Sequence, residues 1–201
     1  MSSWAFIDMS IYSKPTKLHW NYFLAIERDV EVLSRYVEFD TRNFDCFSIE
    51  IVRILLAVGS ETDVICKQIC RTINPSSKAD DINDYRNEIT SAFPHISDFE
   101  VLVPRFGLSL HPWDEWRDAT AGVPLWWTAY NKVKHHRDSH YEYANLKNAL
   151  NALGGLFVVV LHLYKDDAES GGLSPHPQLF WLGAAHTQPK SVIDTMPCYK
   201  L

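Results

Sequence analysis

The 201-residue sequence has few cysteines, no excess of basic residues and no long uninterrupted apolar run. Four cysteines in a chain of this length do not make a disulfide framework, so we expect a reducing compartment, the cytoplasm. With 19 Lys and Arg against 25 Asp and Glu, the net charge of −6 excludes a broad basic face that coats nucleic acid. Any contact with RNA or a nucleotide must therefore be local.

Further absences bear on secretion, membranes and metals. The opening "MSSWAFIDMS" lacks a basic region and an apolar stretch, so we expect no signal peptide. The apolar run "ALGGLFVVVLHLY" at 152–164 is shorter than a bilayer-spanning helix, and we expect no membrane contact. Cys66 and Cys70 lie one helical turn apart, which suits two metal ligands. Reduced thiols on a buried helix face explain this spacing better, and we predict no metal and no cofactor.

The hydrophobic content of 46% is sufficient for a packed core, and its periodicity predicts a mainly α protein, a bundle of four or five helices. We expect one domain over 1–165 and an irregular C-terminal extension over 166–201, packed on the domain through Phe180 and Trp181. Apolar spacing and helix-start residues predict helices over 17–38, 48–73, 79–91, 124–136 and from Asp138 or Ser139 to about Tyr164.

Two segments depart from this helical pattern. Prolines and a glycine between 94 and 123 predict a long ordered loop, with a short strand at 99–103 and packing by its own aromatic side chains. The pair Gly154-Gly155 is costly inside the last helix, so we expect it to allow close packing against another helix.

The stretch "YNKVKHHR" at 130–137 concentrates basic and titratable groups on this acidic chain. A helical wheel places Trp127, Asn131, Lys134 and His135 on one side, whereas His136 faces elsewhere. A histidine titrates near neutral pH, which suits acid–base work. However, cations also favour the C-terminal end of any helix because they oppose its dipole, so charge alone needs no functional explanation.

Two neighbouring features extend this hypothesis. Arg137 and His140 flank the predicted start of the next helix, whose unpaired backbone N–H groups favour an anion. On the second helix, Glu50, Arg53 and Glu61 share a sector beside the apolar face, while Asp63 and Lys67 form an i,i+4 pair on the opposite side. The acidic stripe is either a surface ion pair or a counterpart of the basic cluster.

A resemblance adds to this interpretation. The segment "WWTAYNKVKHHRDSHYEYANLKNALNALGGLFVVVL", with "FSIEIVRILLAVGSETDVICK" as the earlier core helix, resembles the α-helical HEPN superfamily (higher eukaryotes and prokaryotes nucleotide-binding). The resemblance covers roughly 45–165. The motif departs from the family pattern, because Asn131 stands where an Arg is expected, four residues before His135, and Arg137 follows the histidines.

Many HEPN proteins are metal-independent endoribonucleases of toxin–antitoxin and phage-defence systems, in which a homodimer pairs two motifs under a cognate regulator. The resemblance then implies that His135 assists attack by a ribose 2′-hydroxyl, Lys134 and Arg137 stabilise charge, Asn131 positions the phosphate and Glu61 orients the cluster. Other members are non-catalytic and bind nucleotides, RNA or proteins. In that alternative Lys134, Arg137, His140 and Trp127 bind nucleic acid or phosphate, or the cluster forms a structural network with Glu61. Both alternatives stay open at this point.

Overall fold

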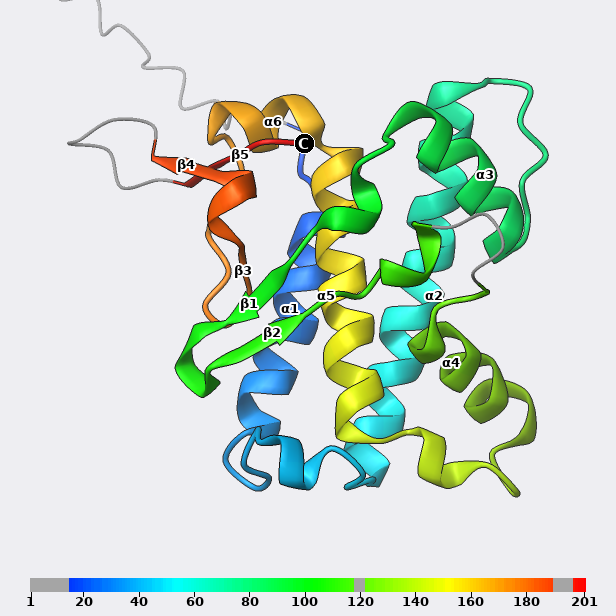
Figure 1. The fold of residues 1–201 in the computed structure, drawn as a ribbon, viewed down its shortest axis with the longest axis vertical. Coiled ribbons are helices and arrows are strands. Elements are labelled where there is room, and N and C mark those ends of the chain that lie inside the picture. The colour runs from blue at the N-terminus through cyan, green and yellow to red at the C-terminus, as the bar shows by residue number, and fades with distance from the viewer. Residues whose placement is uncertain (1–14, 118–121, 190–196) are drawn as a thin grey trace, which may run out of the picture.

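The computed structural model describes residues 15–117, 122–189 and 197–201, and it confirms a mainly α fold (Figure 1). Helix α5 lies at the centre, α1, α2 and α4 pack against it, and α3 packs against α2. Positions 1–14 of the predicted domain, 118–121 of the predicted loop and 190–196 of the extension lie outside the described residues. The helices are α1 (Leu18–Leu33), α2 (Ile49–Ile73), α3 (Ile82–Ala92), α4 (Leu125–His136), α5 (Leu146–Leu163) and the short α6 (Lys165–Ser170).

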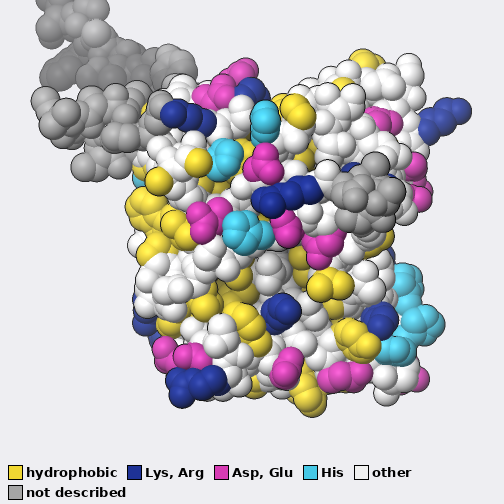
Figure 2. Space-filling model, viewed as in Figure 1, with side chains coloured by type: hydrophobic (Ala, Val, Ile, Leu, Met, Phe, Trp, Pro, Cys, Tyr) yellow, Lys and Arg dark blue, Asp and Glu magenta, His cyan; other side chains and the backbone are white. Residues whose placement is uncertain are grey.

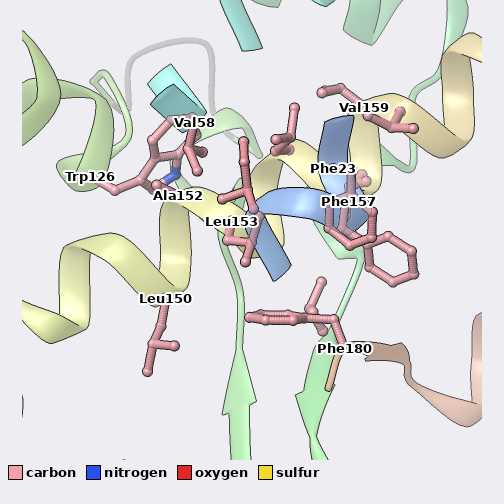
Figure 3. Close-up of a cluster of buried hydrophobic side chains, with 14 of the residues drawn as sticks. Phe23, Val58, Trp126, Leu150, Ala152, Leu153, Phe157, Val159 and Phe180 are labelled. Carbon is pink, nitrogen blue, oxygen red and sulfur yellow. The ribbon is translucent and has the colours of Figure 1, made fainter. Parts of the chain in front are cut away.

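Helix α5 is buried on every side. From Ala149 to His162 all residues except Asn151 are buried, because helices cover one side of α5 and strands cover the other. The ring of Phe157 stacks on Phe23 of α1, with centroids 5.1 Å apart. Figure 3 shows how side chains of α5 meet side chains of α1, α2, α4 and the C-terminal segment, including Phe23, Val58, Trp126 and Phe180.

By length and composition, α5 is a helix that could cross a membrane, with a mean hydropathy of 1.5 over 18 residues. The apolar run at 152–164 is itself shorter than a span, but the helix that contains nearly all of it is 18 residues long. Yet 78% of that window is buried within the fold, as in the core helix of a soluble protein. The burial of α5, and not its length, is what is consistent with a soluble protein.

The two glycines of α5 meet different neighbours. A Cβ on Gly155 would lie 2.9 Å from the ring of Trp126 on α4, which confirms the predicted close approach of another helix. A Cβ on Gly154 would lie 3.6 Å from Val101 and Leu110, an ordinary contact with strands rather than with a helix. Of these two glycines of α5, only Gly155 is therefore required by packing.

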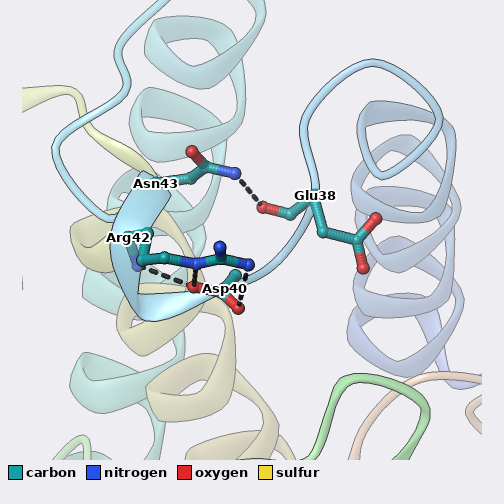
Figure 4. A network of polar contacts seen from close by, with 4 residues as sticks. All are labelled: Glu38, Asp40, Arg42 and Asn43. Carbon is teal, nitrogen blue, oxygen red and sulfur yellow. Dashed lines mark hydrogen bonds and ion pairs between the residues drawn. The ribbon is translucent and has the colours of Figure 1, made fainter.

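Of the two helix ends on either side of the turn at 34–48, one differs from its prediction and the other follows it. Helix α1 ends at Leu33 rather than at residue 38, and the chain turns over Ser34–Val37. Asp40 then holds the next turn: its carboxylate accepts hydrogen bonds from the backbone N–H and Nε of Arg42, each at 2.8 Å, as Figure 4 shows. The start of α2 follows its prediction, because Ser48 Oγ accepts a hydrogen bond from Ile51 N–H at 3.2 Å.

The predicted loop at 94–123 contains a hairpin. Strand β1 (Val101–Val103) lies within the predicted strand at 99–103, and it pairs antiparallel with β2 (Leu108–Leu110), which the sequence did not reveal. Gly107 closes the turn with a φ of 62°, a conformation that favours glycine. The hairpin crosses over α5 in Figure 1.

The extension at 166–201 is less irregular than predicted. Strand β3 (Trp181–Leu182) pairs with β1, which gives the sheet order β2-β1-β3. Strands β4 (Thr187–Pro189) and β5 (Pro197–Tyr199) form a second antiparallel pair. Phe180 is buried as predicted, but Trp181 is 43% exposed, so of these two residues only Phe180 packs the extension on the domain.

A buried carboxylate ties this extension to the first helix. Glu27 of α1 is 2% exposed, and its oxygens accept hydrogen bonds from the backbone N–H groups of Gln178, Leu179 and Phe180 at 2.8–3.1 Å. Burial raises the pKa of Glu27, and the three N–H groups oppose that rise. The contact fixes the backbone just before β3.

His162 should make stability depend on pH. Its Nδ1–H donates to the Val158 carbonyl at 2.8 Å, and burial lowers its pKa from 6.5 to about 4. As pH falls below about 6.5 the unfolded chain takes up the proton first, so the free energy of unfolding decreases, by up to about 3 kcal/mol at pH near 4. Urea unfolding of wild type and His162→Leu should show this pH-dependent difference; parallel pH profiles would contradict it.

The two glycines of α5 form a matched pair of variants. Gly155→Ala forces the Trp126 ring to move and should lower the free energy of unfolding by about 1–3 kcal/mol. Gly154→Ala has room for its methyl group, and the higher helix propensity of Ala should raise stability by up to about 1 kcal/mol. Urea unfolding of both variants measures the difference. Equal shifts in the two variants would show that the Trp126 contact does not constrain the helix.

Candidate functional site

The exposed end of α4 carries a concentrated basic surface. Within residues 132–140 lie three of the 19 Lys and Arg and three of the nine His of the whole chain. The inner face of α4 is buried through Trp126, Ala129, Tyr130 and Val133. We call the outer group the α4 cluster, and histidines gather at this edge of the molecule in Figure 2. The cluster consists of Lys132, Lys134, His135, His136, Arg137 and His140.

The positive charge of this cluster is not neutralised by carboxylates. Among the described residues, Lys132, Lys134 and Arg137 form no ion pair. Instead, Lys132 Nζ lies 3.9 Å from the centroid of the Tyr143 ring, and Lys134 Nζ lies 5.4 Å from that of Tyr130. An aromatic face attracts a cation without cancelling its charge. The surface can therefore still bind an anion.

The three histidines are accessible side by side. The ring centroids of His135 and His136 are 6.4 Å apart, and those of His136 and His140 are 6.2 Å apart. His135 and His136 are exposed, and within the described ranges neither ring forms a hydrogen bond. His140 Nδ1 lies 3.0 Å from Ser139 Oγ. The ring nitrogens of His135 are thus available to a ligand.

Two hollows adjoin this end of α4 and meet at Ile82, Trp127 and Asn131. The first, of about 310 Å³, is the acidic hollow. The second, of about 350 Å³, is the apolar hollow. The acidic hollow is lined in addition by Asp63, Lys67, Asp80, Asp81, Tyr130 and Lys134. The apolar hollow is lined in addition by Val123, Thr128, Lys132, His135 and His136.

Most charged side chains that line the acidic hollow already form ion pairs or hydrogen bonds within the protein. Lys67 Nζ binds Asp63 at 2.9 Å, which confirms the predicted i,i+4 pair, and Asp80 at 2.7 Å. Asp63 also accepts a hydrogen bond from the Tyr85 hydroxyl at 2.7 Å. Asp81 accepts hydrogen bonds from the first backbone N–H groups of α3. Lys134 is left as the hollow's unpaired cation.

The predicted anion site at a helix start is wrong. Helix α5 begins at Leu146, not after Asp138 or Ser139, and Asn145 Oδ1 caps it by accepting from Asn148 N–H at 3.0 Å. The N–H groups of Leu146 and Lys147 donate to the carbonyls of Cys46 and Phe44 at 2.9 and 3.1 Å. These N–H groups are therefore not available to a phosphate. Arg137 and His140 lie in the connection before α5.

The acidic stripe of α2 does not meet the α4 cluster. Glu61 lies 2.6 Å from Nδ1 of His19 on α1, so it is not the group that orients Lys134 or Arg137. Arg53 binds Glu50 at 3.0 Å and Asp29 at 3.3 Å on the surface, which confirms the surface ion-pair interpretation. The wheel had placed these side chains on the correct face of α2, but it could not identify α1 as their neighbour.

Sequence reasoning missed a polar cluster where α1, α2 and α5 meet. His19 and Glu61 are half-buried there, Lys17 lies over the ring of Tyr164 at 5.4 Å, and Lys17 also pairs with Asp167. The partners are far apart in the sequence, 42 residues for His19 and Glu61, so no local spacing reveals them. At the α4 cluster the sequence also missed Lys132, which lies over Tyr143, and Ile82 of α3.

The cysteine pair of α2 faces the core. Cys66 and Cys70 are both buried, and burial raises the pKa of each thiol, that of Cys70 to about 12. This agrees with reduced thiols on a buried helix face. Over residues 15–117, 122–189 and 197–201, no group of three His, Cys, Asp or Glu is arranged to hold a metal ion.

Comparison of the chain with family models, curated proteins and solved structures found no match in any of the three. A function therefore has to be inferred from the α4 cluster and its two hollows.

Loss of the cap of α5 should destabilise the connection beneath the cluster. Asn145→Ala removes the oxygen that accepts from Asn148 N–H, and it should lower the free energy of unfolding by about 1 kcal/mol. Asn151→Ala, inside the same helix, is the control, since alanine is the best helix former. Thermal unfolding of both variants measures the difference in stability. If Asn145→Ala unfolds at the same temperature as the wild type, the cap contributes nothing to stability.

Proposed function

We propose that this chain is a HEPN-like protein that binds RNA through the α4 cluster. The observation that carries the proposal is the group of half-buried Lys132 and exposed Lys134 and Arg137, which forms no ion pair among the described residues of a chain with a net charge of −6. Phosphate groups attract Lys and Arg, and Arg binds phosphate oxygens in a bidentate manner. The order of elements, with the cluster before a long apolar helix, supports the resemblance to HEPN proteins.

The binding has to be local and only moderately dependent on salt. Each cation that neutralises a phosphate of single-stranded nucleic acid contributes about −0.7 to the slope of log K against log salt, so three cations give a slope of about −2. A broad basic face would give a steeper slope. The acidic remainder of the surface repels RNA elsewhere and confines it to the end of α4.

Fluorescence anisotropy of labelled RNA across a salt series tests this proposal. Lys132→Gln and Arg137→Gln should each weaken binding and reduce the slope by about 0.7, because each removes one phosphate contact. Lys200→Gln is the matched control, since Lys200 is also exposed but follows β5, away from α4. Absence of binding by the wild type, or an equal effect of Lys200→Gln, would refute RNA binding at the cluster.

A second function, metal-independent endoribonuclease activity, is favoured by the access of solvent to His135. Its ring is free, and Asn131 lies one turn earlier beside the same hollow. His135 would take the proton of a ribose 2′-hydroxyl whose oxygen attacks the adjacent phosphorus. The 5′-oxygen would leave with a proton taken from solvent water, giving a 2′,3′-cyclic phosphate, while Lys134 and Arg137 stabilise the added charge. Such a nuclease would work in the cytoplasm as a homodimer within a defence or toxin-type system, under a cognate regulator protein.

Incubation with total RNA, with and without EDTA, separates the two functions. Wild type should cleave RNA if His135 is a general base, whereas His135→Ala should lose cleavage but retain most binding. His136→Ala is the control, since its ring neighbours that of His135. If the RNA stays intact with the wild type and with both variants, nuclease activity is refuted and the proposal of RNA binding is unaffected. Cleavage that EDTA abolishes would refute a metal-independent mechanism.

A further inference from the structure

The apolar hollow has properties that phosphate binding alone does not require. Ile82 and Trp127 are buried in its floor, and Val123 and Thr128 line its wall. Its volume of about 350 Å³ falls in the lower range of small-molecule sites, which are mostly apolar with a few polar groups. An apolar space beside unpaired cations suits a ligand that joins a flat ring to a phosphate.

Asn131 is the polar group that faces both hollows. It is half-buried, and in the described part of the chain its side-chain amide forms no hydrogen bond. The amides of Asn145, Asn148 and Asn151, by contrast, all bond to backbone groups. A free amide offers two donors and an acceptor, the complement that the edge of a nucleobase presents.

Cations lie on either side of this amide. Lys132 lines the apolar hollow and Lys134 lines the acidic hollow, so each of the two hollows that meet at Asn131 has one of these lysines in its lining. Successive phosphates of one strand can therefore contact the two lysines while the base between them turns toward Asn131. The exposed imidazole of His135 stands at the rim, where its ring can stack on the base.

We propose that the apolar hollow holds one unpaired nucleobase of single-stranded RNA, with the Asn131 amide bonded to its edge and Lys132 and Lys134 on the adjacent phosphates. This inference rests on the proposed RNA binding and specifies its substrate class. A duplex keeps its bases stacked and paired, so it can reach the lysines but cannot place a base in the hollow. The protein should therefore discriminate by strandedness as well as by charge.

The test compares one RNA of about ten nucleotides, within the range of known single-strand sites, with the same RNA annealed to its complement. Wild type should bind the single strand more tightly than the duplex. Asn131→Leu, which keeps the side-chain size but loses the amide, should weaken single-strand binding about tenfold and leave duplex binding and the salt slope unchanged. Asn151→Leu is the matched control and should bind both RNAs as wild type does.

A second variant fills the hollow without altering the amide. Thr128 is exposed on α4 and lines the hollow, so Thr128→Met should also lower single-strand affinity while the protein stays folded. A free nucleoside monophosphate should compete only weakly, since it lacks the second phosphate; full competition would show that the ligand is a nucleotide rather than RNA. If wild type binds neither RNA, the proposed RNA binding itself fails. If it binds both equally and Asn131→Leu changes nothing, the nucleobase site is overturned and RNA binding at the cluster stands.

Discussion

The fold depends on the need to cover α5 on every side. From Ala149 to His162 this helix presents apolar or small residues almost all round, so neighbouring elements must shield each face from water. Helices α1, α2 and α4 supply part of the cover, and the β1–β2 hairpin and C-terminal segment supply the rest. The position of α4 follows from this requirement: its Trp126 face is pressed against Gly155, and its last turn is left in solvent with the cations.

The residue patterns were sufficient to predict most of the helices, but they did not predict which segments contact one another. Ser48 and the apolar spacing after it predicted α2 almost to the residue, because a cap and a periodicity are local properties. The start of α5 was misplaced because Asn145, and neither Asp138 nor Ser139, caps the helix, and Asn145 is held opposite Phe47 by a β-bridge between residues far apart in the sequence. The pairing of β3 with β1 is likewise a long-range contact, which no window of neighbouring residues contains.

In the candidate site, too, local groupings of residues were predictable from the sequence and long-range contacts were not. The wheel correctly grouped Asn131 with Lys134, both of which line the acidic hollow, and it correctly separated the faces of α2. The wheel could not show that Glu61 forms a hydrogen bond with His19. It also could not show that the first N–H groups of α5 donate to carbonyls of the chain before α2. Both findings remove partners that a catalytic site would have used. What remains is a group of cations, imidazoles and the Asn131 amide, and the proposed RNA binding rests on this group.

The carboxylate of Glu27 links the first described helix to residues 178–180, across 151 positions of the sequence. During synthesis, α1 leaves the ribosome long before its three N–H partners exist, so Glu27 must wait in water as a solvated charge. The core beneath it cannot be sealed until Leu182 has been made, because β3 enters the sheet directly after those residues. Closure of this part of the core therefore comes late relative to the synthesis of α1, and until then the nascent chain exposes the apolar surface of α5 to chaperones and proteases.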